Sequence, residues 1–326
     1  MYSERVLAVL VLGWASVWAS CPSSGNINPC KCRDETPGLI MDCSSVTSSA
    51  QLLSAFSHDM PDSSFQFFEI VKLSGRCPLE KIPANVFGST TFMFVWFGQT
   101  EITTVDPQAF AGNELSMLEL TIADANKLTS FPFESMGEMH SLYKLLLSNT
   151  KLDTISHVGP APNLTQVSVT GSQVSSIVPQ AFKDLGRLTR LDLHDNPLTS
   201  IQDGWFAAST SQPWVVYLDG CSISDISPGA FSGTLPSGVF LNGNQLTTLP
   251  EATFRPLLEH LQASDAAGDL AHYVDVTNNP LVCDCDIRWV VDSATLHPFL
   301  RDAVCSNGDV AGTNVVDLPS DFFASC

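Results

Sequence analysis

Basic residues are scarce in this chain, which has 15 lysines and arginines against 34 aspartates and glutamates and a formal charge of −19 at pH 7. A negative excess of this size repels polyanions. It therefore disfavours nucleic acids, heparin-like polymers and anionic lipid surfaces as partners. The excess favours a basic partner or serves solubility alone, and solubility is the simpler interpretation.

The sequence also lacks the signatures of common catalytic sites. Its seven histidines form no His-x-x-x-His pair, and it has no Gly-x-Ser-x-Gly elbow, phosphate-binding glycine loop or dinucleotide fingerprint. The one catalytic-looking cluster is His194 with Asp192 and Asp195, which neighbouring strands could bring near Ser168 or Asp219. On an open sheet these side chains would lie in water, where no desolvation adjusts their pKa values. We therefore expect a protein that is not an enzyme, with no cofactor.

Long apolar runs are nearly absent. The one exception, Val6 to Val17, follows Arg5 and leads to Val17-Trp-Ala19, whose small residues suit the minus-three and minus-one positions of a signal-peptidase site. This run is shorter than the roughly 20 apolar residues that span a bilayer. We therefore predict a signal peptide at residues 1–19, and a secreted, extracellular chain without a membrane anchor.

A repeated pattern, Leu-x-Leu-x-x-Asn-x-Leu, fills most of the chain. It is clearest in Leu191-Asp-Leu193-His-Asp-Asn196-Pro-Leu198 and Val239-Phe-Leu241-Asn-Gly-Asn244-Gln-Leu246. The Asn position is filled in turn by Cys77, Thr100, Asn126, Thr150, Ser172, Asn196, Cys221, Asn244 and Asn279. All steps but the last fall within the 20 to 29 residues expected of a leucine-rich repeat. The pattern predicts an α/β solenoid of about nine repeats. A curved parallel sheet would form its concave face, and short helices, 3-10 turns and loops its convex face.

Each position of the repeat has a structural role. Leu191 and Leu193 point inward from a short strand while the residue between them points outward. The buried Asn, Thr, Ser or Cys that follows satisfies backbone groups, and stacked turns align these side chains into a ladder. A second apolar position predicts a spine of core side chains: Phe87, Phe110, Met136, Phe182, Phe206, Phe231 and Phe254.

Eight of the ten cysteines cluster at the two ends of the repeats, between positions 21 and 43 and between 283 and 326. In a secreted chain this predicts disulfide caps over end turns that have no neighbour. Zinc is disfavoured because Cys-x-Cys is too tight for the usual ligand gap. Four cysteines permit three pairings in each cap. We place the N-terminal cap at residues 20–64, the repeats at 65–281 and the C-terminal cap at 282–326, around one continuous core.

Cys77 and Cys221 lie between the caps, too many turns apart to pair with each other in one molecule. Cys221 occupies a ladder position, which predicts a buried neutral thiol. Cys77 occupies the first ladder position with one extra residue before it, and it could remain free or form an intermolecular disulfide.

The outward strand residues should form rows on the concave face, and a binding site should lie there. The residues between the two inward positions are Trp96, Leu146, Ser168, Asp192, Tyr217, Phe240 and Asp275; two places further on come Gly98, Ser148, Thr170, His194, Asp219, Asn242 and Thr277. Exposed aromatics on a rigid sheet are typical contact anchors, and the aspartates add an acidic field. The predicted binding residues are Trp96, Asp192, His194, Tyr217, Asp219, Phe240 and Asp275. The alternative is that the aromatics are ordinary exposed residues and the acids keep the sheet soluble.

Two further features stand apart from the repeat. In the long last step, Leu257, Leu258 and Leu261 suit one face of a convex-side helix, and residues 264–269 suggest a projecting loop that is either functional or a tolerated insertion. The sequon Asn163-Leu-Thr165 predicts an N-glycan on Asn163 if the chain is secreted.

These residues resemble the secreted leucine-rich repeat family over essentially the whole mature chain. The cysteines at positions 21–43 look like its N-terminal cap, and Asn279-Pro-Leu-Val-Cys-Asp-Cys-Asp-Ile-Arg-Trp289 looks like the start of its C-terminal cap. The resemblance implies four disulfides: Cys21 with Cys32, Cys30 with Cys43, Cys283 with Cys305, and Cys285 with Cys326.

The short chain that ends at its cap, with degenerate ladder residues such as Thr100, Thr150 and Ser172, is similar to the non-catalytic subunits of secreted shrimp luciferases. That resemblance implies a small catalytic partner subunit and a stabilising role for this chain. The alternative is an extracellular adhesion, matrix or innate-immune recognition protein that binds a protein or glycan on the concave face. The oligomeric state is left open.

Overall fold

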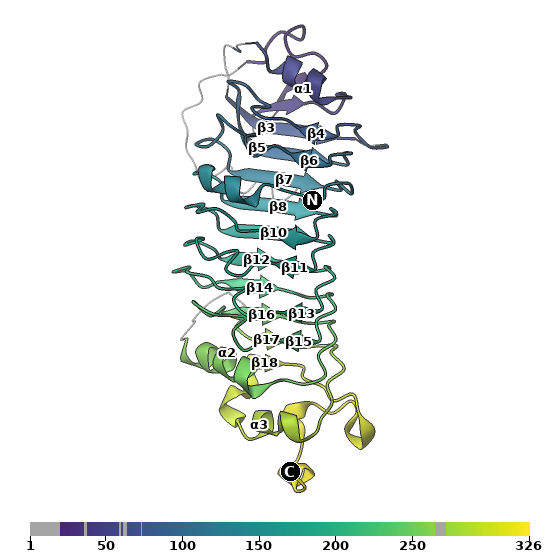
Figure 1. Ribbon diagram of the computed structural model, residues 1–326, viewed down its shortest axis with the longest axis vertical. Coiled ribbons are helices and arrows are strands. Elements are labelled where there is room, and N and C mark those ends of the chain that lie inside the picture. The colour runs from purple at the N-terminus through teal and green to yellow at the C-terminus, as the bar shows by residue number, and fades with distance from the viewer. Residues whose placement is uncertain (1–19, 36–37, 59, 61–63, 73, 265–271) are drawn as a thin grey trace. The chain divides into compact units, whose positions relative to one another are not determined.

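The computed structural model describes residues 20–35, 38–58, 60, 64–72, 74–264 and 272–326. The predicted signal peptide and nearly all of the predicted loop at 264–269 lie outside these residues. The chain divides into two compact units, Met1–Lys151 and Leu152–Cys326, each described by itself. In both units short strands lie side by side and run nearly parallel (Figure 1).

The N-terminal unit begins with a hairpin and continues as a parallel sheet. Strands β1 (Lys31–Glu35) and β2 (Gly38–Asp42) pair antiparallel. The parallel strands that follow are β3 (Ser64–Val71), β5 (Thr91–Gly98), β7 (Glu119–Ala123) and β8 (Lys144–Ser148). Outside this sheet lie α1 (Ser49–Ala55), the short parallel pair β4 (Lys81–Ile82) and β6 (Thr104–Val105), and the 3-10 helix η1 (Phe133–Glu138).

The C-terminal unit is also built on parallel strands. Its strands are β10 (Gln166–Thr170), β12 (Arg190–Asp192), β14 (Val215–Tyr217), β16 (Gly238–Phe240), β17 (Val274–Asp275) and β18 (Leu300–Arg301). Two short parallel pairs accompany it: β9 (Thr154–Ile155) with β11 (Ser176–Ile177), and β13 (Ser200–Ile201) with β15 (Asp225–Ile226). The last strand, β18, falls within the region that the sequence predicts as a cap, so the cap itself extends the sheet.

Helices of the C-terminal unit gather near its end. Helix α2 (Glu251–Ala263) buries Leu257, Leu258 and Leu261, as the apolar spacing predicts. Helix α3 and five 3-10 helices build the cap: η2 (Cys285–Ile287), α3 (Arg288–Val291), η3 (Ala294–Phe299), η4 (Gly308–Val310), η5 (Val315–Asp317) and η6 (Ser320–Phe323). Within the cap, the indole of Trp289 donates to the backbone oxygen of Leu249 at 2.7 Å, which ties α3 to the last repeat.

Strand alternation and the apolar spine both form the core as predicted. Leu191 and Leu193 are fully buried, and so are their counterparts on neighbouring strands. All seven predicted spine residues are buried: Phe87, Phe110, Met136, Phe182, Phe206, Phe231 and Phe254. The solenoid of stacked turns predicted from the repeat is therefore the observed fold.

The asparagine ladder satisfies backbone groups of two adjacent turns. The side-chain nitrogen of Asn196 donates to the backbone oxygens of Leu193 (2.9 Å) and of Val169 on the preceding turn (2.7 Å). Its side-chain oxygen accepts from the backbone nitrogen of Val174 at 3.1 Å. Asn244 and Asn279 repeat this geometry two and three turns later, with Cys221 at the ladder position of the turn between Asn196 and Asn244. Because the three asparagines are buried, these bonds replace water that cannot reach the turn.

The ladder differs from the prediction in two places. The register pairs Trp96 with Thr121, which puts Ala125 rather than Asn126 beside Thr100. Ala125 is fully buried and Asn126 is exposed, so the Asn126 assignment was wrong by one residue. Cys77 does occupy the ladder, bridged to Thr100. However, the register pairs Glu69 with Trp96, and Cys77 lies eight positions after Glu69 whereas Thr100 lies four positions after Trp96. The insertion before Cys77 is therefore longer than the single residue predicted.

In nine of the turns, the residue immediately before the ladder position adopts a left-handed backbone conformation, and Arg76, before Cys77, does not. The nine residues with positive φ at this place are Gln99, Asp124, Asn149, Gly171, Asp195, Gly220, Gly243, Asn278 and Asp302. Glycine, asparagine and aspartate adopt this conformation at the lowest cost. They occupy eight of the nine positions, which accounts for the polar or glycine residue before the ladder in the repeat.

The four disulfides implied by the family resemblance are all present: Cys21–Cys32, Cys30–Cys43, Cys283–Cys305 and Cys285–Cys326. Cys77 and Cys221 are free and buried. Since Cys77 is fully buried, its thiol cannot reach a second chain, which corrects the alternative of an intermolecular disulfide. Burial raises the pKa of Cys77, and it raises that of Cys221 to about 11.

We expect both free thiols to resist alkylation in the native chain, because only the thiolate reacts and burial disfavours it. Iodoacetamide at pH 8 should leave Cys77 and Cys221 unmodified. After denaturation in urea without reductant, intact-mass measurement should show two added groups per chain, matching the two free cysteines. Rapid labelling of either thiol in the native chain would show that it is not buried.

Candidate binding face

The strand register of the C-terminal unit aligns the predicted outward residues in one row. Ser168, Asp192, Tyr217, Phe240 and Asp275 are successive partners across five strands. Arg301 of β18 continues the row beside Asp275. Four of the predicted binding residues, Asp192, Tyr217, Phe240 and Asp275, therefore share one face of the sheet, called the open face here because its side chains point away from the buried leucines.

An aromatic row crosses this open face, made of Tyr217, Phe240 and Tyr273 between Arg190 and Arg301. The rings of Tyr217 and Phe240 stack with centroids 4.5 Å apart and planes 9° from parallel, and Tyr273 meets Phe240 edge-on at 5.5 Å. The guanidinium of Arg190 lies 3.9 Å from the Tyr217 ring centre, and that of Arg301 lies 4.5 Å from the Tyr273 ring centre. These contacts hold each ring in one orientation, so the row is rigid before any partner arrives.

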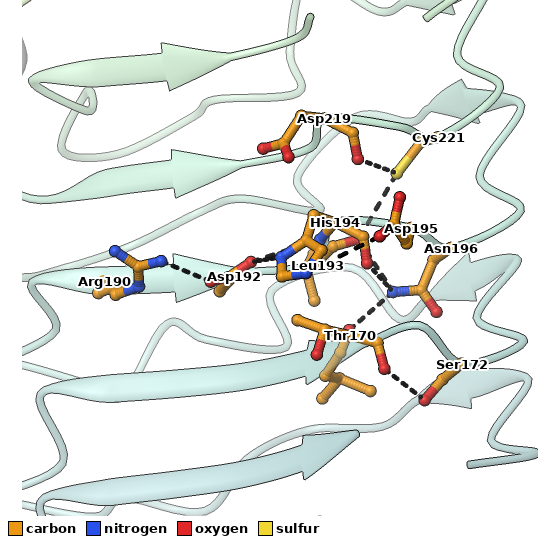
Figure 2. Close-up of polar contacts among 11 residues, drawn as sticks. Thr170, Ser172, Arg190, Asp192, Leu193, His194, Asp195, Asn196, Asp219 and Cys221 are labelled. Atoms are coloured by element: carbon orange, nitrogen blue, oxygen red, sulfur yellow. Dashed lines mark hydrogen bonds and ion pairs between the residues drawn. The ribbon is translucent and has the colours of Figure 1, made fainter. Parts of the chain in front are cut away.

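Asp192 lies beside Tyr217, at one end of the aromatic row, and its carboxylate is contacted from two sides (Figure 2). Arg190 donates to one carboxylate oxygen at 2.7 Å, and Nδ1 of His194 lies 2.6 Å from the other. The residue is only 4% exposed. The expectation that Asp192 faces water was therefore wrong, because the neighbouring arginine and histidine cover it.

Asp219 lies one strand further along, opposite His194 in the register, and its carboxylate is half-buried. Burial is the main cause that raises the pKa of Asp219, and the negative charges of Asp192 and Asp195 add to it, while a hydrogen bond from its own backbone nitrogen and the nearby His194 lower it. Among the described residues, no lysine, arginine or histidine lies within ion-pair distance of this carboxylate. In Figure 2 the only bond drawn to Asp219 goes to its backbone oxygen, from the Cys221 thiol.

We expect Asp219→Asn to raise the melting temperature at pH 7. A carboxyl whose pKa is higher in the folded than in the unfolded chain destabilises the fold when it is ionised. As the pH falls through the folded pKa towards the ordinary value of 3.8, the carboxyl becomes protonated and this cost is lost. The difference in melting temperature between the variant and the unmodified chain should therefore shrink. Thermal unfolding at pH 7 and pH 4 measures both effects.

Asp225→Asn is the matched control for this measurement. Asp225 is exposed on β15, outside the sheet that carries the open face, and its replacement removes the same charge. A melting temperature that rises equally in both variants would mean that the gain comes from total charge rather than from Asp219.

The remaining acidic residues differ in their surroundings. Asp275 accepts from the backbone nitrogen of Thr277 at 3.0 Å and from its hydroxyl at 2.5 Å. Asp195 lies in the turn after β12 and has a side chain that is 66% exposed, 4.0 Å from the His194 ring. Asp302 follows β18 and accepts from the Thr277 hydroxyl at 3.3 Å. Carboxylates thus line the end of the strands beside the aromatic row.

Trp96, the remaining predicted binding residue, belongs to the N-terminal unit. Its row there contains Asp42, Glu69, Thr121 and Leu146. The indole lies against Gly98, where an added Cβ would come within 3.3 Å of its nitrogen. Phe67 and Phe94 stack beside this row with ring centres 5.0 Å apart. The N-terminal unit therefore has its own partly apolar face.

Tyr273 of the aromatic row and the two arginines beside it, Arg190 and Arg301, were not identified from the sequence. Arg190 and Tyr273 lie two residues before Asp192 and Asp275, so the alternation of the strand would have indicated them had the strand been extended by one step. Arg301 lies in the predicted cap, and no repeat motif marks β18 there. Among the described residues, no group of three histidines, cysteines or acids has the geometry to hold a metal ion.

The repeat that builds this face also matches a known family. The leucine-rich repeat family matches residues 162–211, which include β10 and β12. The fold of the chain is a leucine-rich repeat solenoid. The family matched over these residues is a repeat family and not a family of enzymes.

Two relatives of this leucine-rich repeat protein differ in how much of it they cover. It is 28% identical over 339 residues to the Oplophorus-luciferin 2-monooxygenase non-catalytic subunit of Oplophorus gracilirostris, an alignment that covers 94% of this chain and 88% of that subunit. It is 29% identical over 208 residues to the leucine-rich repeat transmembrane protein FLRT2 of Rattus norvegicus, over 59% of this chain and 31% of that protein. The relatives thus include a short non-catalytic subunit and a longer membrane protein.

A solved structure has the same fold. The crystal structure of human trophoblast glycoprotein, or Wnt-activated inhibitory factor 1, superposes with a TM-score of 0.52 and 17% identity, over 94% of this chain and 99% of that one. Within the part of this chain that the structure describes, no helix is long and apolar enough to cross a bilayer.

Proposed function

We propose that this leucine-rich repeat protein is a secreted, non-enzymatic subunit that binds and stabilises a catalytic partner in a luciferase-like monooxygenase complex. The observation that carries the proposal is the extent of the alignment with the Oplophorus non-catalytic subunit, which runs over 94% of this chain and 88% of that one. An alignment of this extent reaches into both cap regions, because each of them is longer than the uncovered part of this chain.

The open face supports a role in binding rather than in catalysis. Preorganised aromatic and arginine side chains are typical of interface residues, because little conformational entropy is lost when they make contact. The histidine beside Asp192 has no nucleophile within bonding distance among the described side chains, and its carboxylate partner is already engaged by Arg190. The site thus has the chemistry of a contact surface.

Secretion belongs to the same proposal. Disulfides form and persist in oxidising compartments, and four of them close the two caps. We propose cleavage of a signal peptide after Ala19 and a glycan on Asn163, whose side-chain oxygen accepts from Arg187 at 2.8 Å and whose nitrogen is the atom to be modified. Amino-terminal sequencing and mass measurement before and after enzymatic deglycosylation test both.

A second candidate function is extracellular adhesion, matrix binding or innate-immune recognition. The similarity to FLRT2 over 59% of this chain favours it, because that relative is a transmembrane protein rather than an enzyme subunit. In this case the ligand would be a receptor, a matrix protein, a microbial surface or a glycan.

Affinity capture of the tagged chain from its native secretion separates the two. The first function predicts a second chain at a fixed ratio, with luminescence on Oplophorus luciferin that follows the second chain while the purified repeat protein stays dark. Turnover of luciferin by the purified repeat protein alone would overturn the non-catalytic role. Capture of a receptor, matrix or microbial component without any luminescent chain would support the second function.

A further inference from the structure

The open face of the C-terminal unit contains an imbalance of charge beside a rigid apolar surface. Asp192 is covered by Arg190 and His194, and Asp275 accepts two bonds from Thr277. The carboxylate of Asp219, between them in the order of strands, accepts a hydrogen bond from its own backbone nitrogen but forms no ion pair among the described residues. A half-buried carboxylate without an ion pair is costly to ionise, and a cation supplied by another molecule lowers that cost.

The aromatic row limits what that molecule can be. The faces of Tyr217 and Phe240 cover each other, Arg190 covers the outer face of Tyr217, and Tyr273 meets Phe240. Sugars and quaternary ammonium groups bind aromatic residues through free ring faces. The row offers them mostly ring edges instead, which suit the side of an aliphatic or aromatic side chain.

The charge around the aromatic row also favours a cationic side chain as the partner group. Around the row, Asp192, Asp195, Asp219, Asp275 and Asp302 outnumber Arg190 and Arg301, and both arginines are engaged with rings of the row. A cation brought to Asp219 therefore meets a negative field and recovers part of the cost of burying that carboxylate.

We propose that a partner protein places a lysine or arginine side chain on the carboxylate of Asp219 and packs an apolar neighbour of that residue against Tyr217 and Phe240. This inference rests on the proposed binding function and adds the chemistry of the contact. Asp219 fixes where the cation lies, and the aromatic row fixes which side of it the apolar residue takes. The direction of the partner segment across the strands follows from these two contacts.

A peptide probe tests the contact directly. A short fluorescent peptide that alternates lysine and leucine is titrated with the full chain, with a glutamate and leucine peptide of equal length for comparison. We expect the lysine peptide to bind more weakly as salt rises, because the contact is electrostatic. Asp219→Asn should weaken it about tenfold or more, as expected for loss of one partner of a desolvated charge pair. Asp225→Asn should bind like the unmodified chain.

Three results would overturn the inference. The lysine peptide could fail to bind, or it could bind the unmodified chain and Asp219→Asn with equal affinity. The glutamate peptide could also bind the unmodified chain as tightly as the lysine peptide does. Saturable binding of chitohexaose that is lost in Asp219→Asn would instead assign the face to glycans. Thermal unfolding accompanies each titration, because Asp219→Asn is expected to stabilise the chain, so that a loss of binding cannot come from unfolding.

Capture of the native partner separates failure of this inference from failure of the proposed function. If the unmodified chain and Asp219→Asn capture the luminescent chain equally, the proposed function stands and the contact at Asp219 is wrong. If the unmodified chain captures no second chain, the proposed function fails, and the peptide titration alone decides the contact.

Discussion

Replacing Phe87 with alanine should lower the free energy of unfolding by about 3 to 5 kcal/mol, the usual cost of removing a buried phenylalanine side chain. Phe87 is fully buried, and its ring centre lies 4.6 Å from that of Phe92, 4.7 Å from Phe68 and 5.4 Å from Phe56. No side chain nearby is positioned to fill the space, because the neighbours are themselves fixed rings. Urea denaturation followed by tryptophan fluorescence measures the loss.

Phe94→Ala is the matched control for this change. Phe94 lies on the opposite side of the sheet, is only partly buried and stacks on Phe67 alone. Its removal should lower the free energy of unfolding much less than removal of Phe87, because folding buries less of the apolar surface of Phe94. Equal losses at the two positions would mean that the phenylalanine spine does not hold the N-terminal unit together.

Replacing Asn196 with alanine should destabilise the C-terminal unit by about 3 kcal/mol. The change leaves the backbone oxygens of Val169 and Leu193 and the backbone nitrogen of Val174 without their partner inside the turn. Each buried group left unsatisfied costs about 1 to 3 kcal/mol, and water entering the small cavity recovers part of this. The melting temperature and hydrogen exchange at Val174 both report the effect.

Asn126→Ala is the control, because the same residue type is exposed there and lies one place outside the ladder. Its removal should change the melting temperature little. A loss at Asn126 that equals the loss at Asn196 would contradict the role of the ladder, since only the buried side chain bridges two turns.

The repeat period was enough to predict the solenoid and the spine from the sequence, because both depend on residues that recur at a fixed spacing. The caps were predicted from the clustered cysteines, and their four disulfides were implied by the family resemblance. It was not enough at Asn126, where the presence of asparagine suggested a ladder residue and the register of β7 places Ala125 there instead. Ladder positions next to a strand end depend on backbone pairing. A buried alanine carries no sequence signal that separates it from its neighbours.

The arrangement of the open face was predicted in part. Alternation along the strands placed Asp192, Tyr217 and Phe240 on one face, which depends on strand geometry alone. The sequence could not show that Arg190 and His194 would bury Asp192, because that depends on side-chain directions across and along strands. Nor could it show that Arg301 would cover the ring of Tyr273, because β18 belongs to a cap with no repeat pattern.

The column of left-handed residues before the ladder has a consequence for mutational tolerance. Asp195 is largely exposed, and exposure alone would suggest that any substitution is accepted there. Its φ of 56° nevertheless disfavours β-branched residues and excludes proline, and the same holds at the other eight residues of this column. A saturation library of this chain should therefore show nine narrow positions before the ladder, at which surface residues are as restricted as core residues, while Arg76 before Cys77 should tolerate more substitutions.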